Sequence, residues 1–134
     1  MKKEQRIKIW NRYGRKCSYC GCDLEYKDMQ VDHIQSKFHH EYYDLEKNKD
    51  RIENLNPSCR QCNFYKSSDT LEAFRKKLST IHERLNKAFI FRLAVKHGIV
   101  EYKGFNGKFY FEQINKESGD NAASDAELLK SNRT

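Results

Sequence analysis

The sequence contains no apolar run approaching the roughly 20 residues that a transmembrane helix requires. The basic N-terminal segment MKKEQRIKIW also lacks the apolar stretch that follows such residues in a signal peptide. These two absences argue against a membrane or secreted protein, so we expect a cytoplasmic one. Thiols stay reduced in the cytoplasm, where grouped cysteines indicate bound metal more often than disulfides.

Apolar residues are scarce, at 37% of 134 positions, although aromatic residues are frequent. We therefore expect one domain with a small core, which a bound metal would help to stabilise. The motifs described below place the core of this domain in residues 1–66. Residues 67–114 would extend the same domain, and the polar residues 115–134 are expected to be a disordered tail.

The formal net charge of +7 is unevenly distributed along the chain. Residues 1–16 hold seven Lys or Arg against one Glu, and residues 67–97 hold seven against three acidic residues. Residues 23–53 are acidic overall, with nine Asp or Glu against five basic residues. Basic segments around an acidic middle suit a polyanion that binds near a cation. Solvated helix faces are the alternative interpretation.

Two helices are predicted outside the segment that carries the motifs. Residues 3–13 have helical apolar spacing. Asp69 and Glu72 have the spacing of a capping box, which predicts a long helix over 69–97 that ends at Gly98.

The apolar residues between 71 and 88 recur at alternating spacings of three and four. This stripe predicts either packing in the core or against the C-terminal hairpin, or a seam between two chains. A homodimer or a protein partner bound through the 71–97 helix would follow from the second reading.

Short strands are predicted at 24–26 and 30–34, with a turn at 56–57 and a short helix over 59–66. Residues 99–113 read as a β-hairpin, because Asn-Gly in its middle favours a tight turn.

Two C-x-x-C pairs, Cys17/Cys20 and Cys59/Cys62, are the strongest motif in the chain. Four thiolates suit a tetrahedral structural Zn²⁺ with no open position for a substrate. Redox thiols are the weaker alternative. Cys22 is expected to be a free or packed thiol, or else a substitute ligand if the turn shifts.

The segments CSYCG, VDHI, ENLN, CRQCN and YK follow one another in this order. Together they resemble the HNH nuclease family in its four-cysteine zinc form, over about residues 12–66. The resemblance implies an α+β fold with a small ββα-metal (His-Me finger) core and structural zinc. The N-terminal helix, the long C-terminal helix and the β-hairpin would surround this core.

The resemblance also assigns roles to single residues. Asp32 corresponds to the first cation ligand and His33 to the general base. Asn54 corresponds to the central Asn that braces the loop, and Asn63 to the second cation ligand. Asn63 stands where most family members have His, so the pattern reads H-N-N, as in the HNH module of RNA-guided CRISPR nucleases. Carboxylate and amide oxygens are hard ligands, which favours Mg²⁺ or Mn²⁺ as the catalytic cation.

Phosphodiester hydrolysis needs an activated water and stabilisation of the negative charge that develops in the transition state. A cation held by Asp32 and Asn63 can supply the second, and neutral His33 can accept the proton of the water. Neighbouring residues on a regular strand point to opposite faces. We therefore predict that the strand ends, twists or bulges at Asp32 and His33.

Double-stranded DNA is the expected partner, bound through its backbone phosphates rather than its bases. The candidate phosphate-binding residues are Arg6, Lys8, Arg12, Arg15, Lys16 and Lys66. For Lys66, an ordinary solvated lysine is the alternative. His39 and His40 lie in a long polar loop, where a solvated pair is favoured over contact with DNA or metal.

The sequence thus predicts a metal-dependent DNA endonuclease from a phage, mobile-element or restriction setting. The resemblance implies 5′-phosphate and 3′-hydroxyl products. The alternative is a non-catalytic zinc module that binds nucleic acid or protein, such as a phage-encoded inhibitor that reuses this fold.

Overall fold

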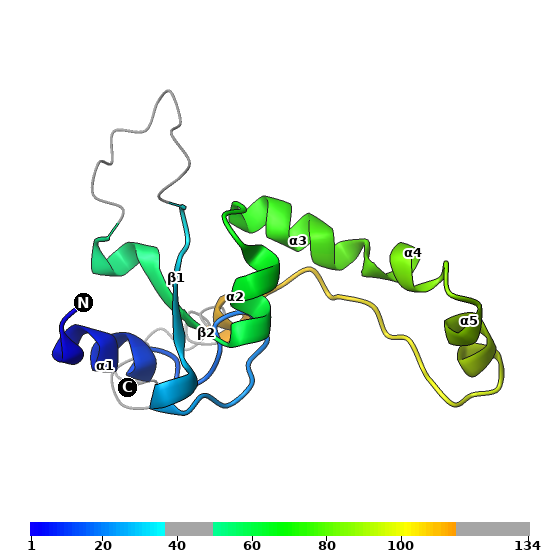
Figure 1. The fold of residues 1–134 in the computed structure, drawn as a ribbon, viewed down its shortest axis with the longest axis horizontal. Coiled ribbons are helices and arrows are strands. Elements are labelled where there is room, and N and C mark those ends of the chain that lie inside the picture. Colours follow the sequence, from blue (N-terminus) through cyan, green and yellow to red (C-terminus); the bar gives the residue numbers. More distant parts are fainter. Residues whose placement is uncertain (37–49, 115–134) are drawn as a thin grey trace, which may run out of the picture.

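The computed structural model describes residues 1–36 and 50–114, which form a small core and a projecting arm (Figure 1). The predictions for His39, His40 and the 115–134 tail lie outside these residues. The helices are α1 (Lys3–Asn11), α2 (Arg60–Lys66), α3 (Leu71–Ser79), α4 (Ile81–Leu85) and α5 (Phe89–Lys96). The strands are β1 (Gln30–His33) and β2 (Leu55–Ser58), and 3₁₀ turns occupy Tyr26–Asp28 and Ile52–Asn54. Within the described ranges, no helix has the length and apolar character needed to cross a membrane.

The core is built on an antiparallel pair of strands, β1 and β2, with Asp32 opposite Asn56 and His33 opposite Leu55. Helix α2 follows β2 directly and packs against β1, which completes a ββα unit. This arrangement confirms the predicted α+β class. The turn predicted at 56–57 is wrong, because Pro57 lies inside β2. A two-stranded sheet has no central strand, so the missing N–H of a proline can face an outer edge.

The strand predicted at 24–26 is also absent. The chain forms one isolated bridge there, between Lys16 and Asp23, and then enters the 3₁₀ turn Tyr26–Asp28. Short apolar runs leave the choice between strand and turn to tertiary contacts, which here favour the turn.

The β-hairpin predicted over 99–113 is wrong. Residues 101–109 contain no strand, and residues 110–114 form a helical turn. The backbone N–H groups of Tyr110 and Phe111 donate to the carbonyls of Tyr19 and Ser18, at 3.1 and 2.8 Å. This segment therefore bonds to the cysteine loop instead of pairing with itself.

The single helix predicted over 69–97 is three helices, α3 to α5. Thr70 caps α3, because its side chain accepts a hydrogen bond from Ala73 N at 3.1 Å, whereas Asp69 pairs with Lys77 at 2.7 Å. The break after α3 falls at Thr80, whose hydroxyl donates to the Lys76 carbonyl at 3.1 Å and competes with helix continuation.

Aromatic rings fill the core beside α2 and α3. Tyr19, Phe74 and Phe109 are at most 5% exposed and pack against one another with Leu55 and Ile9. Phe74 belongs to the apolar stripe of 71–88, so the first part of that stripe packs on the core, as one of the two readings predicted.

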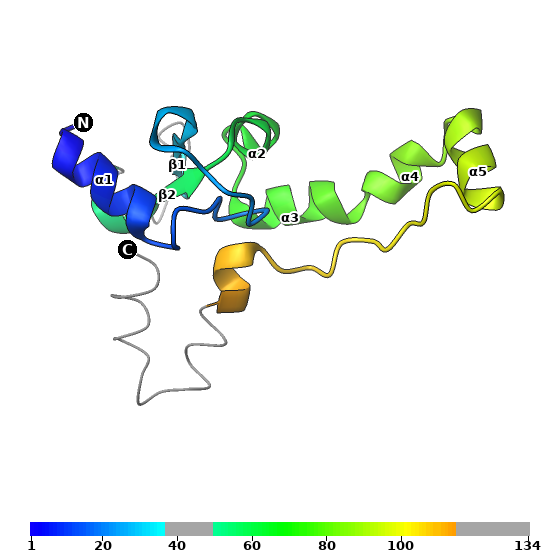
Figure 2. The same ribbon diagram turned by 90° about the horizontal axis from the view of Figure 1, so that it is seen from below.

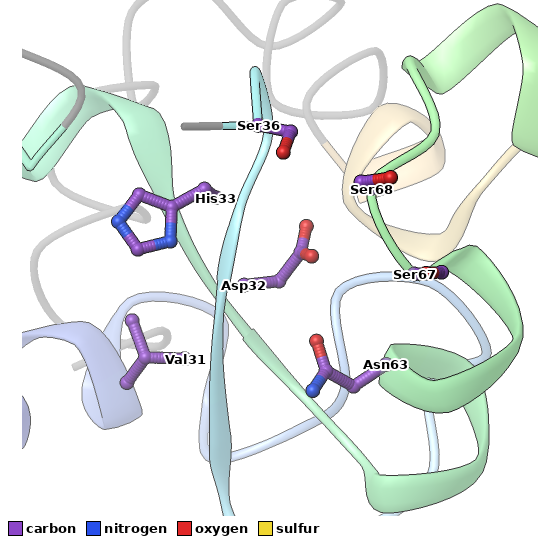
Figure 3. Close-up of a pocket in the computed structure, with 7 residues that line it drawn as sticks. All are labelled: Val31, Asp32, His33, Ser36, Asn63, Ser67 and Ser68. Carbon is purple, nitrogen blue, oxygen red and sulfur yellow. The ribbon is translucent and has the colours of Figure 1, made fainter. Parts of the chain in front are cut away.

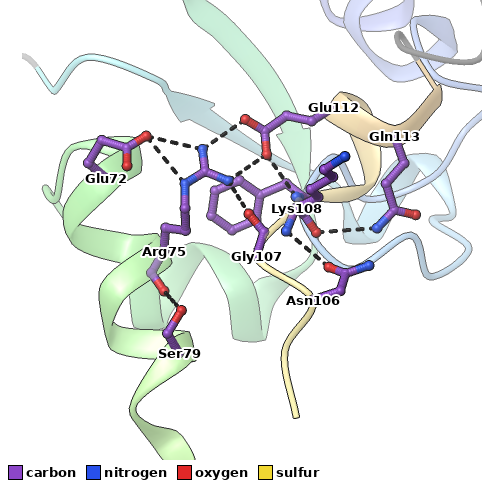
Figure 4. A network of polar contacts seen from close by, with 9 residues as sticks. Glu72, Arg75, Ser79, Asn106, Gly107, Lys108, Glu112 and Gln113 are labelled. Carbon is purple, nitrogen blue, oxygen red and sulfur yellow. Dashed lines mark hydrogen bonds and ion pairs between the residues drawn. The ribbon is translucent and has the colours of Figure 1, made fainter. Parts of the chain in front are cut away.

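Helices α4 and α5 extend away from the core, and the chain then returns beside them (Figures 1 and 2). Arg75 joins the outgoing and returning segments at the base of this arm, through a bidentate pair with Glu112 at 2.7 and 2.8 Å (Figure 4). The same guanidinium donates to the Gly107 carbonyl at 2.6 Å. Gly98 ends α5 with a φ of 71°, the left-handed cap that the sequence predicted.

Candidate active site

Four cysteine sulfurs gather where the first cysteine loop meets the start of α2. The Sγ atoms of Cys17, Cys20, Cys59 and Cys62 all lie within 4.8 Å of one another. Zn–S bonds of about 2.3 Å in a tetrahedron place the sulfurs about 3.8 Å apart. The 3.9 Å between the sulfurs of Cys20 and Cys59 matches that spacing. The cluster fits structural zinc, and Cys22 is exposed outside it.

Local backbone geometry shapes this cluster. The backbone N–H groups of Tyr19 and Cys62 donate to the sulfurs of Cys17 and Cys59, both at 3.4 Å. Hydrogen bonds among these close thiols lower the pKa of Cys20 and raise that of Cys62, as expected where one thiol donates to another sulfur.

A pocket of about 380 Å³ opens between β1 and α2 (Figure 3). It is lined by Val31, Asp32, His33, Ser36, Asn63, Ser67 and Ser68. The structure therefore brings together the predicted base and both predicted cation ligands. Asp32 and Asn63 face each other across the space between the strand and the helix.

The Asp32 carboxylate is 4% exposed and has two protein partners. The Tyr19 hydroxyl donates to its Oδ2 at 2.5 Å. The Lys66 ammonium lies 3.2 Å from Oδ2 and 3.3 Å from Oδ1. Burial raises the pKa of Asp32, and the Tyr19 and Lys66 contacts partly offset that rise. Burial and the nearby Asp32 charge also raise the pKa of Tyr19, so the phenol remains a donor.

Lys66 does not lie at the protein surface, where the predicted phosphate contact would require it. It is fully buried, and its Nζ also donates to the His33 carbonyl at 3.0 Å. Its ammonium is therefore part of the site interior rather than of the protein surface. Lys66 follows Asn63 by three residues on α2, a spacing that places both side chains on the same side of the helix.

His33 ends β1, as the sequence predicted, although its side chain and that of Asp32 leave the strand on different sides (Figure 3). Its Nε2 lies 2.7 Å from Oδ1 of Asp50. A carboxylate only accepts hydrogen bonds, so in the neutral ring the proton sits on Nε2 and Nδ1 keeps its lone pair. Sequence reasoning missed Asp50, which is one of several acidic residues in 23–53 and has no motif spacing.

Asn54 braces the chain directly after His33. Its side-chain amide donates to the Gln35 carbonyl at 3.0 Å and accepts from Gln35 N at 2.8 Å. Its backbone carbonyl accepts from Ile34 N at 2.8 Å. These three hydrogen bonds hold residues 34 and 35 against the 3₁₀ turn that contains Asn54.

Two of the predicted phosphate-binding residues in and directly after α1 bind backbone carbonyls of the protein itself. Arg6 donates to the Met29 carbonyl at 2.8 Å, and Arg12 donates to the Ile52 carbonyl at 2.9 Å. These two arginines tie α1 to the motif-bearing segment, whereas Lys8 is exposed.

The two cations after α1 are also engaged. The Arg15 guanidinium stacks over the Trp10 ring at 4.2 Å, and Lys16 pairs with Asp23 at 2.5 Å. Both side chains lie near the surface, where such contacts are weak and exchangeable.

Comparison with known proteins adds two findings. Residues 17–69 match the family model described as HNH endonuclease. The structure is similar to the Type II-C Cas9 enzyme from Actinomyces naeslundii, with 29% identity and a TM-score of 0.45. That match covers 55% of this chain and 8% of the Cas9 chain, so this chain spans a small part of that enzyme. No curated protein sequence matches the chain.

Proposed function

We propose that the chain, whose residues 17–69 match the HNH endonuclease family model, hydrolyses DNA phosphodiester bonds in a metal-dependent reaction. The observation that supports the proposal best is the shared pocket of Asp32, His33 and Asn63 beside the four-thiol cluster. The products would carry 5′-phosphate and 3′-hydroxyl ends.

Asp32 and Asn63 would hold the catalytic cation. Their oxygens are hard donors, so Mg²⁺ or Mn²⁺ fits them better than a softer ion. Among the described residues that line the pocket, Asp32 is the single carboxylate. Mg²⁺ is usually held by one or two carboxylates together with substrate phosphates, so DNA is expected to complete its coordination. When bound, the cation would polarise the phosphoryl group and stabilise the charge on the departing oxygen.

His33 would accept the proton of the attacking water at Nδ1. The Asp50 carboxylate supports this role, because it accepts from Nε2 and so keeps the lone pair of a neutral ring on the other nitrogen. Asn54 supports it indirectly, because its hydrogen bonds fix the backbone that follows His33.

Lys66 would compensate the charge of Asp32 in the absence of a cation and tie α2 to the end of β1. Its contacts with the Asp32 carboxylate and the His33 carbonyl span both halves of the pocket. In this role it positions the site and does not contact DNA.

Double-stranded DNA is the proposed substrate. The net charge of +7 favours a polyanion, and Lys8 and Lys76 are exposed cations on α1 and α3. Contacts of this kind bind the phosphate backbone, so affinity should fall steeply with salt.

A second candidate function is a non-catalytic zinc module that binds nucleic acid or protein. One observation favours it: Tyr19 donates to Oδ2 of Asp32 and Lys66 to Oδ1, so both oxygens have a partner without a cation.

Plasmid nicking in Mg²⁺ or Mn²⁺ separates the two functions. His33→Ala should reduce the rate about 10²- to 10⁴-fold, as is usual for loss of a general base. His82→Ala is the matched control, because His82 lies in α4 and packs on Tyr102, outside the pocket. Equal nicking by the wild type and His33→Ala, purified identically, would exclude catalysis by this site.

A further inference from the structure

Tyr19 contacts both the thiol cluster and the candidate cation site. It lies between Cys17 and Cys20 in the first cysteine loop, and its backbone N–H donates to the Cys17 sulfur at 3.4 Å. Its hydroxyl donates to Oδ2 of Asp32 at 2.5 Å. One residue therefore spans the distance between the structural sulfurs and the carboxylate.

The ring of Tyr19 is held by parts of the chain that are far apart in sequence. It meets Phe74 of α3 edge-on, with centroids 5.3 Å apart, and Phe109 of the returning segment at 5.2 Å. The backbone carbonyl of Tyr19 accepts from Tyr110 N at 3.1 Å. With 5% of its surface exposed, the side chain has little freedom to turn its hydroxyl elsewhere.

The two partners of Asp32 act differently on its carboxylate. Lys66 Nζ lies 3.2 Å from Oδ2 and 3.3 Å from Oδ1, so it compensates charge without distinguishing the oxygens. The Tyr19 hydroxyl bonds to Oδ2. This hydrogen bond to one oxygen limits rotation of the carboxylate, whereas Oδ1 accepts from the ammonium of Lys66.

We propose that Tyr19 is a positioning residue for the cation site: by holding Oδ2 of Asp32, it fixes the orientation in which this carboxylate would meet a cation. The cysteine loop and the aromatic core fix Tyr19 in turn. The inference rests on the proposed function, because it takes Asp32 as a cation ligand. Outer residues that orient a ligating carboxylate typically change metal affinity about 10- to 100-fold.

The test measures Mn²⁺ binding to the zinc-loaded full chain without DNA. The electron paramagnetic resonance signal of free Mn²⁺ monitors the binding. Tyr19→Phe keeps the ring that packs on Phe74 and Phe109 and removes the hydroxyl. It should raise the Mn²⁺ Kd about tenfold or more. Tyr65→Phe is the matched control, because its hydroxyl accepts from Arg84 at 2.7 Å, away from Asp32. Its Kd should equal that of the wild type.

Two further readouts separate positioning from folding. Zinc content and Tm should be similar in Tyr19→Phe and Tyr65→Phe. In nicking assays, the Mn²⁺ concentration for half-maximal rate should rise in Tyr19→Phe, whereas the rate at saturating Mn²⁺ should change much less.

One further experiment uses the wild type alone and so does not depend on the folding of any variant. With tyrosine labelled at ¹³Cζ, addition of Mg²⁺ should shift the Tyr19 resonance and leave the Tyr65 resonance in place. An unmoved Tyr19 resonance at saturating Mg²⁺ would overturn the proposal, as would equal Mn²⁺ affinities of Tyr19→Phe and Tyr65→Phe.

Asp32→Asn distinguishes this inference from the proposed function. If Asp32→Asn binds Mn²⁺ as tightly as the wild type, Asp32 is no ligand and both ideas fail. If His33→Ala nicks DNA normally while Tyr19→Phe still weakens Mn²⁺ binding, the catalytic proposal fails and the role of Tyr19 stands.

Discussion

The ammonium of Lys66 lies 3.2 Å from Oδ2 of Asp32, and the two side chains are 0% and 4% exposed. A buried pair of this kind adds little net stability, but removal of one partner strands an uncompensated charge. The residue proposed to bind the cation is thus also one on which the fold depends.

Lys66→Met should lower the free energy of unfolding by about 3–5 kcal/mol, because Asp32 would lose its compensating charge inside the protein. Urea unfolding of the zinc-loaded chain measures this loss. Lys27→Met is the control, because Lys27 pairs with Glu25 at the exposed surface at 3.5 Å and should change little. Equal urea midpoints for the two variants would contradict the structural role of Lys66.

Asn54→Ala should destabilise the protein by about 1–3 kcal/mol, because it leaves the backbone groups of Gln35 without their side-chain partner. It should also slow nicking, since the chain after His33 loses its brace. Asn106→Ala removes an amide that accepts from Lys108 N at an exposed site and serves as the control. Unfolding and nicking measured on the same preparations would show whether both effects occur together.

The purified chain should contain one zinc ion, measured by mass spectrometry of the metal. Cys59→Ser should lose that zinc and with it much of its stability, because structural zinc sites contribute directly to folding. Cys22→Ser should keep the zinc, since Cys22 lies outside the thiol cluster. Retention of zinc by Cys59→Ser and its loss by Cys22→Ser would reverse the ligand assignment.

The bond between Arg75 and Glu112 predicts a pH effect on stability. The Arg75 guanidinium lowers the pKa of Glu112, so the unfolded chain binds this proton more tightly than the folded one. The contribution is therefore fully present above the ordinary Glu pKa of about 4.3 and is lost as the pH falls through the lowered value. Urea unfolding of the wild type and Glu112→Gln from pH 7 to pH 3 checks this.

Acid also releases zinc from thiolates, but that affects both proteins alike, so the difference between them is the informative quantity. The wild type should be the more stable at pH 7, and the difference should shrink below about pH 4. If the difference in unfolding free energy between the two proteins is constant from pH 7 to pH 3, the ion pair does not make stability depend on pH.

The two C-x-x-C spacings predicted the thiol cluster, and the resemblance of the ordered motifs to the HNH family predicted that Asp32, His33 and Asn63 would lie together. The contacts of Asp32 could not be read in this way. Tyr19 and Lys66 lie 13 and 34 residues from it, and their packing depends on the whole core. The hydrogen bonds of Arg6 and Arg12 to backbone carbonyls could not be predicted for the same reason. The same basic sequence pattern is expected for a helix that binds DNA and for one that binds carbonyls of its own chain.

The errors beyond α2 have a common cause. Local patterns favoured one long helix and a hairpin, but Thr80 interrupts the helix, and the cysteine loop supplies the hydrogen bonds that a hairpin would have made. Tertiary partners overrode local preference in both places.

The guanidinium of Arg75 touches Gly107, so the chain leaves the core and comes back to it at nearly the same point. The segment between Arg75 and Gly107 is therefore a projecting part of the chain whose two ends are joined by a hydrogen bond. Near its two ends, Leu78 and Phe105 still pack against the core, whereas α4 and α5 contribute no residue to the core cluster of the described chain. Changes in the length of α4 and α5 should therefore leave the core and the pocket intact.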